Sequence, residues 1–363
     1  MPGEFPAIEQ ILERALPGAA LTRVSRFGSD RAIEGDLTSK AAGYGEPLRL
    51  FVRTKDGQDR CLVLHTATTD VFGHDRRADR AASMLLSFDR FATIPRHVKA
   101  IDVGAFDRNG HSATSLRESA EFYLLTEYAE GHTYADELRL AVARGEIKAD
   151  DERHVEALAR LAAVIHAKKI SDPKRYRRSI RDLVGSGEGI FGMVDGYGPN
   201  VPGAPPERLA RIETKAERWR FVLREKEHRL ARTHGDFHPF NILFDGDQIS
   251  LLDSSRGSMG DPADDVTCLS INYIFFAVEH RALWDNVMRP LWARFWDTYL
   301  GLTGDRELLD VCAPFLAWRG LVVANPVWYP AVDAASRDRV LSFVEATLEV
   351  DHFDPKLAED VFS

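Results

Sequence analysis

Cysteine is scarce in this chain, and apolar runs are short. Three cysteines, Cys61, Cys268 and Cys312, occur in 363 residues, and their wide spacing gives neither a disulfide framework nor a zinc pattern. Each has apolar sequence neighbours, so we expect buried free thiols in a reducing compartment. The longest apolar stretches, such as residues 321–324, are too short to span a membrane. The N-terminal segment also has no signal-peptide pattern, so we expect a cytoplasmic protein without a membrane partner.

Positive charge is in deficit. The chain has 47 lysines and arginines against 56 aspartates and glutamates, which gives a formal net charge of −9. Such a surface repels phosphate backbones, so we expect no nucleic-acid partner. A cationic substrate or a metal-bound nucleotide is compatible with this charge. The hydrophobic share of 44% is typical of globular proteins, and the length predicts two packed lobes. Nothing in the sequence indicates an oligomeric state.

The first third of the chain predicts a small lobe rich in β-structure. A short helix is expected over residues 8–16, followed by strands over 49–54 and 61–65. The turn signal at residues 55–58 joins these strands into a hairpin. A second pair of strands is expected over 98–106 and 121–128, with an exposed loop between them.

A helix is expected between those two strand pairs, over residues 74–91. Its apolar positions predict a buried stripe. The stripe consists of Ala78, Ala81, Ala82, Leu85, Leu86 and Phe88.

The rest of the chain predicts a larger, mainly helical lobe. A linker is expected at residues 130–133, and apolar residues at helical spacing predict a helix over 151–168. Residues 171–206, rich in Gly, Pro and Arg, are expected to be irregular. The aromatic-rich tail from about residue 263 to 350 is expected to be helical. We therefore place the lobe boundary between residues 127 and 128.

Polar residues gather around one predicted hairpin in the second lobe. Residues 241–244 and 248–252 are short apolar runs joined by an Asp-Gly-Asp turn. Asp236 and Asn241 lie at the start of the first strand, and Asp253 follows the second. Because the outer ends of a hairpin meet, we expect these three side chains to converge.

That combination suits phosphoryl transfer. One carboxylate must orient and deprotonate an attacking hydroxyl, and hard oxygen ligands must hold magnesium against the phosphates. Asp236 is the candidate base, and Asn241 and Asp253 are the candidate magnesium ligands. The alternative is that Asp236 and Asn241 only stabilise turns. We interpret Asp261, before Pro262, mainly as a structural helix cap.

The stretch from His234 to Asp265 resembles the aminoglycoside phosphotransferase and choline kinase-like family. The resemblance rests on His-Gly-Asp at 234–236, Asn241, Asp253, Gly-Asp-Pro at 260–262 and Asp265. It implies an α+β, protein-kinase-like fold with two lobes: residues 1–127 bind the nucleotide, and residues 128–363 carry catalysis and the substrate. It also implies ATP, or another nucleoside triphosphate, with Mg²⁺ and a small-molecule hydroxyl acceptor.

The resemblance also suggests nucleotide-binding residues in the first lobe. Glu127 and Tyr128 match the hinge whose backbone receives adenine in that family. His65 stands where the family has a lysine, and Asp79 stands where it has a helix glutamate. A His65–Asp79 pair could form, or His65 could be only a packed strand residue. The best candidate for a glycine-rich loop is the stretch at 42–45, which is a weak match. These departures leave a nucleotide-binding pseudokinase with a regulatory role as the alternative.

Other readings of the histidines remain open. His234, Asp236 and His238 have a spacing that could bind a metal in a hydrolase. His234 is more simply a structural residue that supports the loop, and His166 a satisfied histidine of the core or helix end.

Specificity for the acceptor is expected to come from the C-terminal lobe. His238 and Arg256 are candidates near the substrate or phosphates. Trp318, Arg319 and Trp328 lie in stretches where prolines interrupt regular structure, so they are candidates for a cleft. Arg319 favours an anionic substrate, whereas Asp264, Asp265 and Glu279 favour an amine, so the acceptor stays unassigned.

Overall fold

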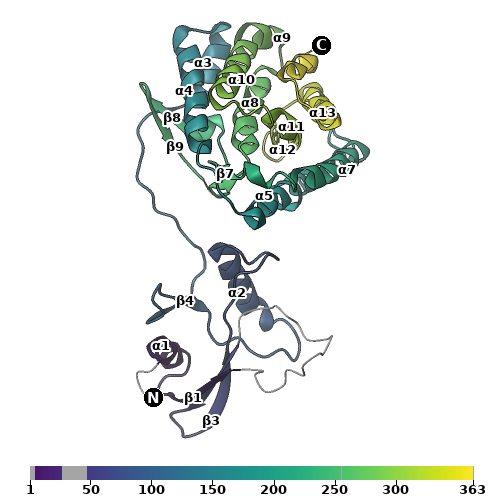
Figure 1. Cartoon of the computed structure of the whole chain (residues 1–363). Helices are drawn as coiled ribbons and strands as arrows, with labels where there is room; N and C mark the ends of the chain where they lie inside the picture. Colours follow the sequence, from purple (N-terminus) through teal and green to yellow (C-terminus); the bar gives the residue numbers. More distant parts are fainter. Residues whose placement is uncertain (1–4, 27–46, 255, 363) are drawn as a thin grey trace. The chain divides into compact units, whose positions relative to one another are not determined.

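The computed structural model describes residues 5–26, 47–254 and 256–362. The chain divides into two compact units, Met1–Thr126 and Glu127–Ser363, which we call the N-terminal and C-terminal units. Strands form much of the regular structure of the N-terminal unit, whereas helices dominate the C-terminal unit (Figure 1). No helix in these described ranges is both long and apolar enough to cross a bilayer.

The N-terminal unit is built on an antiparallel sheet with the strand order β1-β2-β3. The strands are β1 (Ala20–Arg26), β2 (Leu48–Arg53) and β3 (Asp59–Leu64). The hairpin predicted for β2 and β3 is confirmed, and Gly57 supplies a positive φ of 82° in its turn. Helix α1 (Pro6–Ala15) packs on this sheet. The buried core of the unit consists of Ile8, Leu12, Leu50 and Val52.

The buried stripe predicted for the next helix is wrong. Helix α2 (Arg77–Phe91) forms close to the expected range, but none of its residues is buried, and Leu86 is exposed. A helical stripe is buried only where another element covers it. The core of the unit is instead formed between α1 and β2, from which α2 is absent.

The second predicted strand pair is only half right. Strand β4 (Gly104–Phe106) pairs with β5 (Ala113–Ser115), while residues 121–128 form no strand. The segment expected to be an exposed loop begins with a tight turn between β4 and β5. In this turn the Asp107 carboxylate accepts the N–H of His111 at 2.8 Å. Helix α1 then fixes β5, because Arg14 Nη2 donates to the Ala113 carbonyl at 2.6 Å.

The cysteines do not all behave as expected. Cys268 and Cys312 are buried free thiols, and burial raises the pKa of both. Cys61 is exposed, contrary to the prediction. It lies on β3, one of the two outer strands of the β1-β2-β3 sheet, where apolar sequence neighbours do not guarantee a covering layer.

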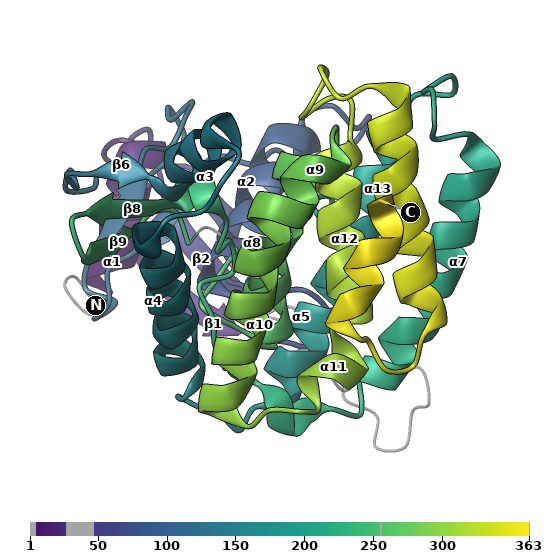
Figure 2. The same ribbon diagram turned by 90° about the horizontal axis from the view of Figure 1, so that it is seen from above.

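The C-terminal unit is a packed set of helices around one large buried core. Its longer helices are α3 (Tyr134–Arg144), α4 (Ala149–His166), α5 (Pro173–Gly185), α7 (Pro206–Leu223), α8 (Ala263–Ala277), α10 (Arg289–Thr303), α12 (Ala313–Ala324) and α13 (Ala334–Glu349). Shorter helical segments are α6 (Ile190–Asp195), η1 (Glu227–Arg229), η2 (Pro239–Asn241), α9 (Arg281–Leu283), η3 (Trp284–Met288), α11 (Leu308–Val311) and η4 (Pro355–Phe362). Helix α10 packs on α4, and α12 packs on both α8 and α13 (Figure 2).

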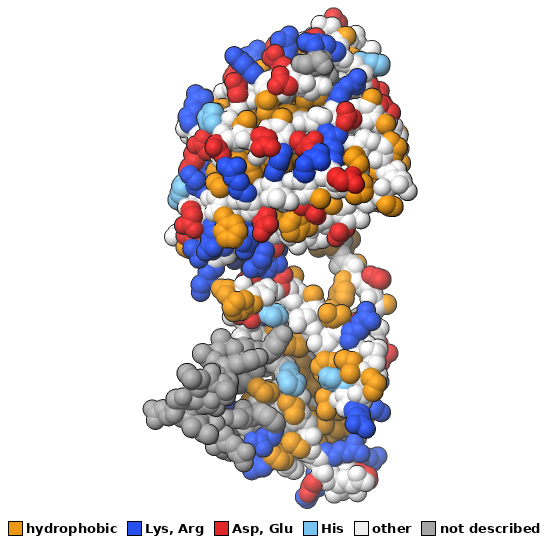
Figure 3. Space-filling model, turned by 90° about the vertical axis from the view of Figure 1, so that its right-hand side faces the viewer, with side chains coloured by type: hydrophobic (Ala, Val, Ile, Leu, Met, Phe, Trp, Pro, Cys, Tyr) orange, Lys and Arg blue, Asp and Glu red, His pale blue; other side chains and the backbone are white. Residues whose placement is uncertain are grey.

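The helix predicted over residues 151–168 is confirmed as α4, with Val155, Leu158 and Ala162 buried. Its outer side carries ion pairs, including Arg153 with Asp150 at 2.6 Å. Acidic and basic side chains are intermixed in the same way over the face of the C-terminal unit that Figure 3 shows.

Residues 171–206 are only partly irregular, because they contain α5 and α6. The side chain of Asp172 accepts the N–H of Arg175 at 3.0 Å and caps α5, which begins at Pro173. The buried face of α5 consists of Tyr176, Ile180, Leu183 and Val184. The expectation is therefore wrong for residues 173–185 and 190–195, and it holds for residues 196–205, which have no helix or strand.

Two small antiparallel sheets carry the motif residues. One pairs β7 (Ala231–Arg232) with β10 (Met259–Gly260). The other has the order β6-β8-β9, with β6 (His132–Thr133), β8 (Ile242–Asp245) and β9 (Gln248–Leu251). The predicted β8–β9 hairpin is confirmed, and part of the expected linker at 130–133 is strand β6.

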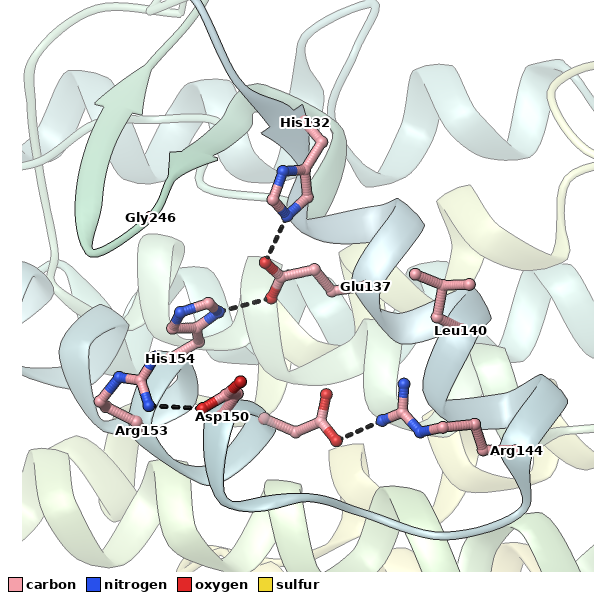
Figure 4. A pocket seen from close by; sticks show the side chains of 9 residues that line it. His132, Glu137, Leu140, Arg144, Asp150, Arg153, His154 and Gly246 are labelled. Carbon is pink, nitrogen blue, oxygen red and sulfur yellow. Dashed lines mark hydrogen bonds and ion pairs between the residues drawn. The ribbon is translucent and has the colours of Figure 1, made fainter.

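A chain of polar contacts fixes this second sheet to the helices (Figure 4). The Glu137 carboxylate of α3 lies 2.7 Å from His132 Nε2 on β6 and 2.8 Å from His154 Nδ1 on α4. The His154 ring stacks on Phe244 of β8, with 4.1 Å between ring centroids. His132, Glu137 and His154 line a pocket of about 300 Å³. Helices α3 and α4 therefore hold the hairpin near its turn.

Candidate active site

The loop between β7 and β8 carries the first candidate residues. Gly235 has a φ of +85°, and a Cβ atom there would lie 2.6 Å from the Gly257 carbonyl oxygen. Only glycine fits this close approach without strain. The sharp turn at Gly235 brings Asp236 against the residues that precede β10.

Asp265 on the first turn of α8 holds the backbone of this loop. Its carboxylate accepts the N–H of His234 at 2.6 Å and the N–H of Gly235 at 2.8 Å. His166 Nε2 lies 3.0 Å from the same carboxylate, and His166 Nδ1 lies 2.7 Å from the Tyr299 hydroxyl. Burial acts to raise the pKa of Asp265, but the hydrogen bond with His166 and the two N–H donors hold that pKa below its usual value.

This arrangement agrees with the structural interpretations of two histidines. His166 is buried and has a partner on each ring nitrogen. His234 Nδ1 lies 3.3 Å from the backbone nitrogen of Asp236. His234 therefore supports the loop from within. In the ranges that the structure describes, no group of three or more His, Cys, Asp or Glu side chains is arranged to hold a metal ion.

Asp236 is nearly buried and contacts several donors. Its Oδ1 atom accepts Arg256 Nη1 at 2.9 Å and Arg319 Nη1 at 3.1 Å. Its Oδ2 atom accepts Asn241 Nδ2 at 3.1 Å and lies 3.4 Å from His238 Nε2. Burial acts to raise the pKa of Asp236, yet the hydrogen bond with His238 and the charges of Arg319 and Arg256 hold that pKa far below its usual range. Asp236 is therefore a carboxylate at neutral pH.

The two candidate magnesium ligands lie at the open end of the β8–β9 hairpin, one before the first strand and one after the second. Asn241 precedes β8 and is joined to the end of β9 by the hydrogen bond from Leu252 N–H to its carbonyl at 2.8 Å. The next residue, Asp253, has a left-handed φ of +48°. Ser254 then bonds the His234 carbonyl at 2.6 Å. An amide and a carboxylate at the same end of a hairpin supply the types of oxygen ligand that Mg²⁺ prefers.

The candidate substrate-binding residues differ in how exposed their side chains are. The Trp318 ring contacts two guanidinium groups, with Arg319 Cζ at 3.8 Å and Arg256 Cζ at 4.9 Å from its ring centroid. Arg319 is 4% exposed, so it contacts Asp236 rather than lining an open cleft. His238 and Arg256 are more accessible and also contact Asp236. Trp328 is exposed on the loop after α12 and has no described contact with this cluster.

The candidate nucleotide-binding residues lie in separate segments of the chain. His65 is exposed directly after β3, and Asp79 accepts the N–H of Arg76 at 2.9 Å, which caps α2. Glu127 and Tyr128 lie in an exposed segment without regular structure. The glycine-containing stretch at 42–45 lies outside the described residues.

The structure adds Glu188 and Cys268, which sequence reasoning missed, and gives Asp264 an arginine partner in place of the expected amine substrate. Asp264 accepts Arg319 Nη2 at 2.6 Å, and Glu188 accepts Arg256 Nε at 2.9 Å. Cys268 Sγ lies 3.9 Å from Asp236 Oδ1. Asp264 and Cys268 are four residues apart and lie near one side of α8. This spacing is the sequence signal that could have indicated that both residues face the same site. Nothing in the sequence marks Glu188, which precedes α6.

The α+β elements, the two units and the loop built around Asp236 define a two-lobed, protein-kinase-like fold. A model of the phosphotransferase enzyme family matches residues 49–308, so the chain belongs to this family and is a phosphotransferase.

Several solved structures are similar at low sequence identity. A choline/ethanolamine kinase family protein from Mesorhizobium loti is 17% identical, with 87% of this chain and 90% of that chain covered and a TM-score of 0.36. A glucosamine kinase in complex with glucosamine, ADP and inorganic phosphate is 14% identical, with 87% and 94% covered and a TM-score of 0.40. An amicoumacin kinase in complex with AMP-PNP is 11% identical, with 96% of each chain covered and a TM-score of 0.41. No curated protein sequence matches the chain.

Proposed function

We propose that this phosphotransferase moves the γ-phosphoryl group of ATP, or of another nucleoside triphosphate, to a hydroxyl group of a small molecule. The observation that carries the proposal is the Asp236 carboxylate, fixed next to Asn241 in a loop whose backbone is bonded to Asp265. A base in such a loop is held before substrate arrives, which is what positioning in phosphoryl transfer requires.

In the proposed reaction, the acceptor oxygen forms a bond to the γ-phosphorus. The bond from that phosphorus to the bridging oxygen breaks, and its electron pair leaves with the nucleoside diphosphate. Asp236 takes the hydroxyl proton. Because its pKa is held low, Asp236 acts mainly by orienting the hydroxyl and accepts the proton late.

Asn241 and Asp253 would hold Mg²⁺, which neutralises charge on the β- and γ-phosphates when bound. We assign nucleotide binding to the N-terminal unit together with Glu127 and Tyr128. The nucleotide contacts proposed for these two residues and for His65 and Asp79 follow from the resemblance alone. His238 and Arg256 are proposed to face the acceptor and the transferred group.

The proposal is tested by ADP release from MgATP against a panel of amino alcohols, sugars and hydroxy acids. With an acceptor found, Asp236→Asn should lower turnover by about 10³-fold, because the base is lost. Its nucleotide binding, followed by thermal shift, should be retained. Asp297→Asn, an exposed change on α10, is the matched control and should keep full turnover.

Two outcomes would contradict the proposal. Full turnover by Asp236→Asn would show that Asp236 is not the base. A wild-type protein that binds MgATP but phosphorylates no acceptor would favour the regulatory pseudokinase instead.

A further inference from the structure

The two oxygen atoms of Asp236 lie in different electrostatic surroundings. Oδ1 contacts two guanidinium groups, from Arg256 and Arg319, and the Cys268 thiol. Oδ2 contacts the amide nitrogen of Asn241 and faces His238 Nε2. The cationic donors of this carboxylate are therefore concentrated on one oxygen.

His238 is held by its own loop. Its Nδ1 atom accepts the N–H of Phe240 at 3.1 Å, and its Nε2 atom lies 3.4 Å from Asp236 Oδ2. Both guanidinium contacts of the carboxylate are on Oδ1, at 2.9 and 3.1 Å. Oδ2 is therefore left to the smaller side chains of Asn241 and His238.

The two arginines on Oδ1 differ in how firmly they are held. The side chain of Arg256 is 26% exposed, and its second partner, Glu188, is 67% exposed. Arg319 is buried on α12, and its Nη2 atom donates to Asp264 Oδ1 at 2.6 Å and to the Gly235 carbonyl at 3.3 Å. Arg256 can exchange partners when a substrate enters, whereas Arg319 is fixed to α8 and to the loop itself.

We propose that Arg319 is a positioning residue for phosphoryl transfer. Anchored by Asp264 and Gly235, it holds Oδ1 of Asp236 and so presents Oδ2 to the acceptor hydroxyl. The proposal rests on the proposed function. In the step that it serves, the acceptor oxygen bonds to the γ-phosphorus, the nucleoside diphosphate leaves with the electron pair of the broken bond, and the hydroxyl proton goes to Oδ2. Solvent later receives that proton.

Three arginine variants separate positioning from folding. Turnover is measured as ADP release from MgATP, with the acceptor found by the screen or with water as the acceptor. Arg319→Met should lower kcat by about 100-fold while the KM values for MgATP and acceptor change less than about threefold, since a misplaced base slows the chemical step. Arg319→Lys keeps the charge and should recover about tenfold of that loss.

Arg337→Met is the matched control, because Arg337 is equally buried but donates only to the carbonyl groups of Ala324, Pro202 and Val332. It should lower stability and leave kcat unchanged. If Arg319→Met does not fold, Asp264→Asn removes the charged anchor of Arg319 and should lower kcat in the same direction. A rise in KM with unchanged kcat in the Arg319 or Asp264 variants overturns the proposal, as does an equal kcat loss in Arg337→Met.

A second measurement does not depend on turnover. Chemical denaturation of Arg319→Met, Asp236→Asn and the double variant should show non-additive shifts, because the two side chains are in contact. Additive shifts in an active enzyme overturn the positioning role alone. A wild-type protein that releases no ADP overturns the proposed function and the positioning role together, and non-additive shifts would then still identify the ion pair.

Discussion

Asp253 follows β9 in a left-handed conformation, with a φ of +48°. Aspartate and asparagine tolerate this region better than most residues, since their short side chains bond locally. The turn directs the chain from the hairpin to Ser254, which bonds the His234 carbonyl. The same residue can thus shape the loop and offer a carboxylate oxygen to a cation.

Asp253→Asn separates these two roles, because asparagine keeps the tolerance for positive φ and removes the charge. We expect the wild-type melting temperature to rise with MgATP, since a ligand that binds only the native state stabilises it by RT ln(1 + [L]/Kd). The variant should lose most of the magnesium-dependent part of this rise. Asp247→Asn, in the exposed turn of the same hairpin, is the control. Equal magnesium-dependent shifts in all three proteins would rule out Asp253 as a ligand.

The core of the site was predictable because its residues are close in sequence. Asp236 and Asn241 are five residues apart, and the β8–β9 turn returns the chain to them, so local pattern sufficed. Arg319 was identified as a substrate residue because the sequence could not show that α12 packs on α8. Its bonds to Asp236 and Asp264 span 83 and 55 residues. Contacts over such separations depend on helix packing, which no local pattern encodes.

Helix α8 begins at a buried ionic cluster that the sequence predicts only in part. Asp261 was interpreted as a cap, and its Oδ1 does accept the Ala263 N–H at 3.0 Å. The same carboxylate also accepts Arg229 Nε at 2.9 Å and the Tyr176 hydroxyl at 2.9 Å. Asp261 therefore joins the start of α8 to η1 and α5. Because Asp265 lies on the first turn of the same helix, these contacts also help to position Asp265 against residues 234–235.

Asp261→Ala should lower the free energy of unfolding of the C-terminal unit by about 3–5 kcal/mol, because it leaves the buried Arg229 without this partner. Tyr176→Phe removes one neutral donor from the same carboxylate and should cost about 1 kcal/mol. Urea denaturation followed by circular dichroism measures both. A cost for Asp261→Ala no larger than that for Tyr176→Phe would mean that Asp305, which also pairs with Arg229, compensates fully.

Helices and strands were predictable where one signal dominated. The apolar spacing of α4 and the turn between β8 and β9 each had a single interpretation, and both were confirmed. Residues 121–128 are apolar enough for a strand, but the partner of β4 is β5, which a tight turn brings closer. In residues 171–206, arginines obscured the helical spacing of the buried face of α5. Competing local signals, rather than weak ones, caused these errors.

The two units have separate buried cores. Among the described residues, four buried side chains form the core of the N-terminal unit, whereas the core of the C-terminal unit extends from Tyr134 to Val361 and shares none of them. Stability grows with the apolar surface that a core removes from water. The N-terminal unit is therefore expected to be the less stable of the two.

Scanning calorimetry should show two transitions with different sensitivities. Leu12→Ala deletes a buried side chain of α1 and should destabilise the earlier transition by about 2–4 kcal/mol. Leu158→Ala, on the buried face of α4, should shift only the later one. A single transition that moves equally with both variants would show that the units unfold together.

Cys61 has a practical consequence. All three thiols of the chain lie in described segments, and Cys61 is the exposed one, on β3 of the N-terminal unit. The other two are buried and have raised pKa values, so they form few thiolates. A maleimide dye should therefore label the native protein at one position without any engineering. With a second dye on a cysteine introduced in the C-terminal unit, energy transfer could follow the two units as nucleotide binds.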